Sequence, residues 1–65
     1  MKINIFIERT GEMKKIETKS ISELFSKLSI NKETVLIVKN NELVTEDEPI
    51  IDGDEIKFLS VISGG

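Results

Sequence analysis

A strand with one buried face is predicted at the start of the chain, because isoleucines alternate with polar residues over residues 2–8. The isoleucines in phase are Ile3, Ile5 and Ile7. Phe6 falls out of phase and is expected on the opposite face of the sheet. Residues 9–12 contain Gly11, which can adopt the positive φ of a turn, so the more polar residues 13–18 are expected to return as a second strand.

The hydrophobic period changes after residue 19, which indicates a helix. Ser20 is followed three residues later by Glu23, a capping box in which a hydroxyl and a carboxylate accept hydrogen bonds from free amides at a helix start. Hydrophobic residues then recur three and four positions apart, on one stripe of the helix. They are Ile21, Leu24, Phe25 and Leu28. We expect this stripe to pack on a sheet.

Three further strands are predicted after the helix, separated by turn signals at Asn40-Asn41 and at Asp52-Gly53-Asp54. They cover residues 34–39, 42–44 and 55–61. Within the last of these strands, Ile56 and Phe58 share one phase and are expected to face the helix.

The element order β-β-α-β-β-β predicts one α+β domain. A single helix must bury its stripe, and a mixed sheet has one face to offer it, which is the β-grasp (ubiquitin-like) arrangement. We expect the β-grasp domain to span residues 1–61 and residues 62–65 to form a flexible C-terminal tail that ends in a diglycine.

The composition argues against an enzyme. A chain of 65 residues has little room for an enclosed pocket, and it contains no cysteine, histidine, tryptophan or tyrosine, so the usual nucleophiles and soft metal ligands are missing. The acidic run Glu46-Asp47-Glu48 is an unsuitable catalytic or metal site, because adjacent loop residues point apart. We expect no catalytic residue, no metal and no cofactor bound by the chain itself.

Charge and hydropathy indicate where the chain acts. No apolar run approaches the roughly 20 residues that span a bilayer, and no signal peptide is recognisable, so we expect a cytoplasmic monomer that binds no membrane. The net charge is −3, and residues 42–65 contain seven of the twelve acidic residues. This acidic third would repel nucleic acid and could steer the chain toward a basic partner, although the charges could also serve solubility alone.

Gly64 and Gly65 supply the candidate chemistry. We expect Gly65 to carry a free carboxylate, ionised at neutral pH, which can attack the α-phosphate of ATP and become an acyl-adenylate. Two residues without Cβ can lie extended in a narrow channel and leave the carbonyl unhindered. The dipeptide could also be a simple frayed end.

With these features the chain resembles the small ubiquitin-like sulfur carriers of the ThiS/MoaD type, together with archaeal small modifier and Urm-type proteins. The similarity spans essentially the whole chain. Residues 52–65 look like the family's acidic turn, final strand and diglycine tail, and residues 20–28 look like its helix.

The resemblance implies a protein cosubstrate. An adenylating enzyme of the ubiquitin-activating type would consume ATP at Gly65, and sulfur transfer would then produce a thiocarboxylate for a downstream sulfur-accepting enzyme. Gly64 would provide clearance, and ATP and Mg²⁺ would belong to the partner.

The phase of the strands predicts a docking face for that enzyme. If the isoleucines face the helix, Phe6, Leu59 and Val61 face outward, and we expect Ile37 beside them. We interpret these residues, with Ile62, as the docking site. The residues expected at its acidic rim are Asp52, Asp54 and Glu55. The alternative is that Phe6 and Ile37 complete a minor core under residues 42–50.

The branch of the family stays open. Molybdopterin-pathway members usually have prolines shortly before the tail, and residues 59–62 have none. Thiamine-pathway members tend to have Asn-Gly and an arginine where this chain has Asn40-Asn41-Glu42. The archaeal modifiers look closer, and their tails can also be joined to lysines. Three functions therefore remain: a sulfur carrier, a covalent protein modifier joined through Gly65, and a non-covalent binding module.

Overall fold

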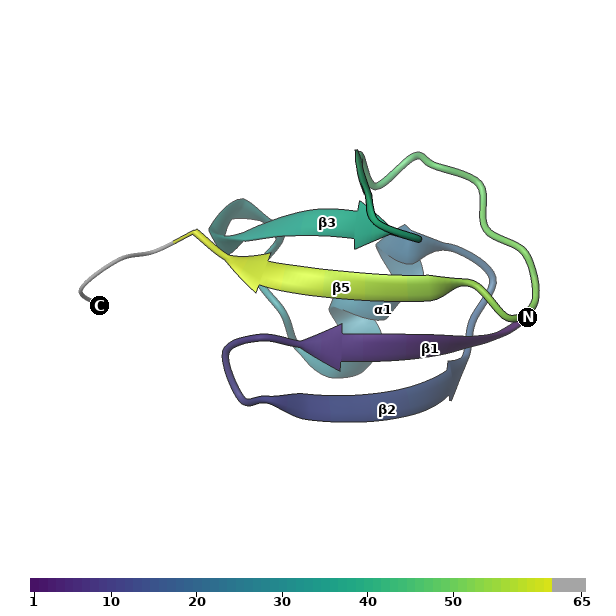
Figure 1. Cartoon of the computed structure of the whole chain (residues 1–65), viewed down its shortest axis with the longest axis horizontal. Helices are drawn as coiled ribbons and strands as arrows, with labels where there is room; N and C mark the ends of the chain where they lie inside the picture. The colour runs from purple at the N-terminus through teal and green to yellow at the C-terminus, as the bar shows by residue number, and fades with distance from the viewer. Residues whose placement is uncertain (62–65) are drawn as a thin grey trace.

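The computed structural model, which describes residues 1–61, is a five-stranded mixed sheet with one helix on one face (Figure 1). In chain order the elements are β1 (Lys2–Ile7), β2 (Glu12–Glu17), α1 (Ile21–Leu28), the 3-10 helix η1 (Lys32–Thr34), β3 (Val35–Lys39), β4 (Glu42–Val44) and β5 (Glu55–Ser60). The predicted β-grasp order is confirmed, and strand ends differ from the prediction by at most one residue. The η1 turn was not predicted.

The strand order places the last strand in the middle of the sheet. The sheet runs β2-β1-β5-β3-β4, with β1 and β5 parallel and the other neighbours antiparallel. The acidic turn precedes β5 at one end of the sheet, and β5 finishes at the opposite end (Figure 1).

The core lies between this sheet and α1. Its buried members are Ile3, Ile5, Ile21, Leu24, Ile37, Ile50, Ile56 and Phe58. Phe25 packs against Phe58 with the ring centroids 5.4 Å apart, and Leu28 and Ile7 pack at the margin of the core. The predicted helix stripe and the predicted inward phase of the isoleucines are both confirmed.

Ile37 was expected to face outward, and this prediction is wrong. Ile37 pairs with Phe58 of β5 and Val44 of β4, and only 8% of its surface is exposed. Directly opposite residues in an antiparallel pair share one face of the sheet, so Ile37 faces the helix together with Phe58. Its neighbours Leu36 and Val38 consequently face outward.

The turn between β3 and β4 is set by two asparagines. Asn40 and Asn41 both have positive φ, 49° and 72°, which the two-residue hairpin requires and asparagine tolerates. Asn40 also ties this hairpin to β5: its side-chain oxygen accepts from the amide of Glu55 at 3.0 Å, and its side-chain amide donates to Asp54 at 3.0 Å.

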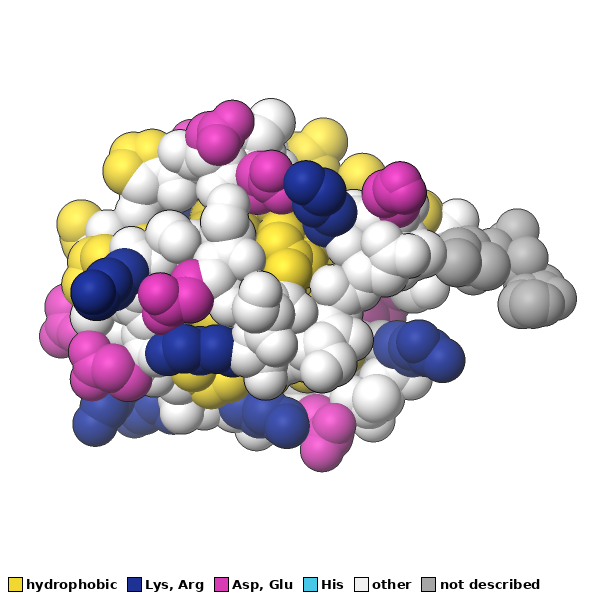
Figure 2. Space-filling model, turned by 180° about the vertical axis from the view of Figure 1, so that it is seen from behind, with side chains coloured by type: hydrophobic (Ala, Val, Ile, Leu, Met, Phe, Trp, Pro, Cys, Tyr) yellow, Lys and Arg dark blue, Asp and Glu magenta, His cyan; other side chains and the backbone are white. Residues whose placement is uncertain are grey.

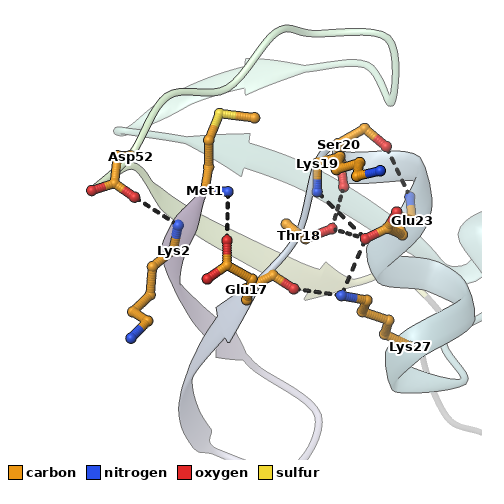
Figure 3. A network of polar contacts seen from close by, with 9 residues as sticks. All are labelled: Met1, Lys2, Glu17, Thr18, Lys19, Ser20, Glu23, Lys27 and Asp52. Carbon is orange, nitrogen blue, oxygen red and sulfur yellow. Dashed lines mark hydrogen bonds and ion pairs between the residues drawn. The ribbon is translucent and has the colours of Figure 1, made fainter.

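The helix start is held by a modified capping box (Figure 3). The Ser20 hydroxyl accepts from the Glu23 amide at 3.2 Å, as predicted. The Glu23 carboxylate turns elsewhere, to the hydroxyl of buried Thr18 at 2.9 Å and to the Lys27 ammonium at 3.1 Å. The Lys27 contact, helped by Thr18, lowers the pKa of Glu23. Lys27 also donates to the Glu17 carbonyl, which joins α1 to β2.

The acidic turn joins several elements of the fold through hydrogen bonds. The Asp54 carboxylate, 6% exposed, accepts from the Ile51 amide at 2.8 Å as well as from Asn40. Asp52 accepts from the amide of Lys2 at 2.7 Å (Figure 3). These bonds join the starts of β1 and β5 to the β3–β4 hairpin. The hydrogen bond from the Ile51 amide, followed by that from Asn40, lowers the pKa of Asp54.

We expect Asp54→Asn to lower the free energy of unfolding at pH 7 by about 1–3 kcal/mol, because an amide offers one oxygen where two donors need acceptors. A carboxylate with a lowered pKa stabilises the fold above its unfolded pKa of about 3.9, and this contribution is lost as pH falls below that value. The deficit of the variant should therefore shrink between pH 5 and pH 3 in urea unfolding. The exposed Asp47→Asn is the matched control, and equal stability of Asp54→Asn and the parent at pH 7 would contradict the assignment.

Candidate functional site

The base of the tail is fixed by contacts on both sides of β5. The Ser60 amide donates to the Glu8 carboxylate at 2.9 Å, and the Val61 amide donates to the Thr34 carbonyl at 3.0 Å. The Glu8 amide donates in turn to the Phe58 carbonyl at 3.0 Å. The central position of β5 in the sheet and these three hydrogen bonds thus fix the backbone up to residue 61. The predicted site residues Ile62, Gly64 and Gly65 lie outside the described residues.

The face of the sheet opposite the helix carries a band of hydrophobic side chains. Phe6 of β1 pairs with Met13 of β2, and Val38 of β3 pairs with Leu43 of β4. A second, shorter row is formed by Leu59 of β5 and its partner Leu36 of β3. We call these residues the outer apolar face: Phe6, Met13, Leu36, Val38, Leu43 and Leu59. Figure 1 looks onto it, with α1 behind the sheet.

This face is poorly covered by the rest of the molecule. Met13, Leu36 and Leu43 expose 71%, 45% and 68% of their surface, whereas Phe6, Val38 and Leu59 are partly buried among them. Val61, at the base of the tail, is 46% exposed. So many exposed hydrophobic side chains on one face are unusual for the solvated surface of a small domain, which makes the outer apolar face a candidate binding site.

The opposite surface differs. On the helix side, shown in Figure 2, charged side chains of both signs are interspersed and hydrophobic side chains show only in small separate areas. An open groove lies there, floored by Leu28, Val35 and Phe58 and bordered by Arg9 and Lys14. Of the six exposed large hydrophobic residues among residues 1–61, Met13, Leu36 and Leu43 belong to the outer apolar face.

Two of the three acidic residues predicted at the rim of the docking face lie elsewhere. Asp52 and Asp54 belong to the turn at the far end of β5 and are engaged by backbone amides. Glu55 opens β5 opposite Asn4 and shares its phase with Leu59, so it lies on the outward side. The acidic rim is thus reduced to Glu55, away from the tail.

Phe6, Leu59 and exposed Val61 lie as the sequence predicted, at or beside the outer apolar face. Sequence reasoning missed Leu36 and Val38, which take the place given to Ile37. It also missed Met13 and Leu43, whose signal was their exposed phase on the two edge strands.

The acidic run of the 45–54 loop forms separate ion pairs. Glu46 contacts Lys32 at 3.3 Å, and Glu48 contacts Lys39 at 2.9 Å, which raises the pKa of Lys39. Among residues 1–61, no three His, Cys, Asp or Glu side chains gather as a metal site would require. No helix within the same residues is long and apolar enough to cross a membrane.

Comparison with known proteins gives matches along most of the chain. The model of the ThiS family matches residues 4–65. The sulfur carrier protein TtuB of Thermus thermophilus is 37% identical over 60 residues, which cover 88% of this chain and 92% of TtuB. An uncharacterized protein of Archaeoglobus fulgidus is 48% identical over 44 residues, 68% of this chain and 64% of that protein.

Two solved structures share the fold. A chain in the complex of subunits 1 and 2 of molybdopterin-converting factor from Helicobacter pylori superimposes with a TM-score of 0.79 and 23% identity, covering both chains completely. The thiamine biosynthesis protein ThiS from Geobacter metallireducens gives a TM-score of 0.63 and 24% identity over 95% of this chain and 99% of that one. At these identities the likeness establishes the β-grasp fold alone.

Proposed function

The chain belongs to the ThiS family, and on this premise we propose that it is a ubiquitin-like sulfur carrier with Gly65 as its loading point. It acts as a cosubstrate of a partner enzyme of the ubiquitin-activating type, which supplies ATP and Mg²⁺. The observation that carries the proposal is the anchored end of β5, because it fixes Ser60 and Val61 beside the outer apolar face, directly before the family-matched residues 62–65.

The chemistry takes place in two substitutions. A carboxylate oxygen of Gly65 attacks the α-phosphate of ATP, the bond between the α- and β-phosphates breaks, and pyrophosphate leaves. A sulfur nucleophile at the oxidation level of hydrosulfide then attacks the acyl carbon, AMP leaves, and a proton is released. The net change replaces one carboxyl oxygen by sulfur without oxidation or reduction. Gly64 keeps the path to the carbonyl free of side chains.

The outer apolar face is the docking surface for the adenylating enzyme in this proposal. The face and the tail base share β5, since Leu59 lies on the face and Ser60 is anchored by Glu8. A partner seated on the face would therefore hold the start of the tail at a fixed distance from its nucleotide. Positioning of this kind converts binding energy into a reactive geometry.

Mass spectrometry of protein recovered from its own cells tests the proposal. We expect a fraction of intact chains in which one carboxyl oxygen of Gly65 is replaced by sulfur, and this fraction should disappear when cells lack the adenylating enzyme. An isopeptide-linked remnant on other proteins, without any thiocarboxylate, would instead identify a protein modifier. A tail that carries neither product under sulfur-replete growth would refute activation at Gly65.

A further inference from the structure

Lys57 occupies the middle of the outer apolar face. On β5 it pairs with Phe6 of β1 on one side and with Val38 of β3 on the other. Met13 and Leu43 extend the same row to the two edges of the sheet. One partly buried lysine therefore interrupts a row of four hydrophobic side chains that crosses all five strands.

The charge of Lys57 is not used within the described chain. Three other lysines of residues 1–61 contact carboxylates: Lys27 contacts Glu23, Lys32 contacts Glu46 and Lys39 contacts Glu48. The lysines without an ion pair in these residues are exposed except for Lys57, which is partly buried. No carboxylate in these residues lies within 4 Å of the Lys57 ammonium. The Glu8 carboxylate accepts from the Ser60 amide and forms no ion pair with Lys57.

A partner that covers the outer apolar face must remove water from this ammonium group. An unpaired charge buried in an interface weakens binding strongly, whereas a carboxylate that meets it recovers much of that cost as a charge-assisted hydrogen bond. The residues directly opposite Lys57 on the two adjacent strands are Phe6 and Val38, so neither of them offers the ammonium group a polar partner.

Resting on the function proposed above, we propose that the adenylating enzyme presents an otherwise apolar surface with one carboxylate opposite Lys57. Lys57 is then the residue that fixes the register of docking and so the direction of the tail. A second copy of this chain fits less well, because two-fold packing of the face on itself brings two Lys57 ammonium groups into one interface.

The test combines this chain with the ubiquitin-activating-type enzyme of its source organism in the presence of ATP and Mg²⁺. The rate of pyrophosphate release is the measured quantity. Lys57→Met keeps the length of the side chain and removes the charge, which leaves the partner's carboxylate unpaired. We expect kcat/KM for the carrier to fall about tenfold or more, and further for Lys57→Glu. Lys15→Met and Lys15→Glu are the matched controls, because Lys15 lies on the same side of the sheet, opposite Asn4 and outside the apolar row. Their kcat/KM should stay within about twofold of the parent value.

Three outcomes would overturn the inference. Lys57→Met could be activated as well as the parent or better, which would place an apolar surface opposite this position. The Lys57 and Lys15 variants could lose activity equally, which would indicate long-range attraction alone. Sedimentation could show that the parent is a dimer dissociated by Lys57→Glu, which would make a second copy the occupant. Failure of the proposed function itself is distinguishable, because the unaltered chain would then release no pyrophosphate.

Discussion

Deletion of Gly65 is expected to abolish acyl-adenylate formation while leaving the domain folded. The deletion shortens the tail by about 3.5 Å, and the reacting carboxylate then stops short of the α-phosphate. A misplacement of 1 Å can cost about 10²-fold in rate, so kcat/KM should fall by at least that factor. Pyrophosphate release in the presence of the partner enzyme measures the effect, and thermal unfolding should be unchanged, since the buried core that residues 1–61 form runs from Ile3 to Phe58.

Gly65→Ala is the matched control for this deletion. It restores the length of the tail and adds one Cβ beside the reacting carbonyl, so its activity should lie between those of the deletion and the parent. Activation of the deletion variant at the parental rate would show that Gly65 is not the loading point. Retention of every partner interaction without any adenylation in the parent would favour a non-covalent binding module.

The fold was largely predictable because its hydrophobic pattern is regular where the elements are amphipathic. Alternation over residues 2–8 and 55–61 gave the inward faces of β1 and β5, and the capping box located the start of α1. The 3-10 turn η1 had no such signal, since it depends on Asn31, whose side chain accepts from the Glu33 amide. Short local turns of this type follow from side-chain hydrogen bonds rather than from hydrophobic period.

The orientation of β3 could not be predicted for a related reason. Residues 35–38 are four consecutive aliphatic side chains, so the sequence contains no alternation from which to assign an inward phase. Pairing with β5 determines which residues of β3 face the helix, because it places Ile37 opposite Phe58 and Leu36 opposite Leu59. The place of Lys57 between Phe6 and Val38 likewise appears only once strand order and register are known.

The acidic turn was misplaced because closeness in sequence does not say at which end of a strand a residue lies. Asp54 precedes β5, and the tail follows it, so the six residues of the strand separate them by roughly 20 Å. The acidic side chains then serve the fold, through Asn40 and the amides of Ile51 and Lys2. The hydrophobic part of the predicted docking site is what remains beside the tail. Its contribution to binding of the adenylating enzyme can be measured separately.

Leu36→Asp is expected to raise the KM of the adenylating enzyme for this chain by about 10²-fold with little change in kcat. Leu36 pairs with Leu59 in the row of the outer apolar face closest to the tail, and a carboxylate there replaces a hydrophobic contact and must be desolvated in the docked complex. Because the contact is made equally before and during adenylation, its loss weakens binding rather than the chemical step. Pyrophosphate release at varied carrier concentration separates the two constants.

Two further variants decide whether such a loss reports docking on this face. Leu36→Asn has the shape of the aspartate without its charge and cannot pair with Lys57, so a similar rise in KM would trace the effect to the lost hydrophobic contact. Ile51→Asp introduces the same charge at an exposed hydrophobic residue, 69% accessible, in the loop before the acidic turn and off the outer apolar face. Its KM should remain within about twofold of the parent value, since exposed rim charges contribute little.

If Ile51→Asp and Leu36→Asp weaken activation alike, added negative charge rather than docking on this face is responsible. If neither does, the adenylating enzyme approaches the tail from the helix side, where Arg9 and Lys14 border the groove beside Phe58.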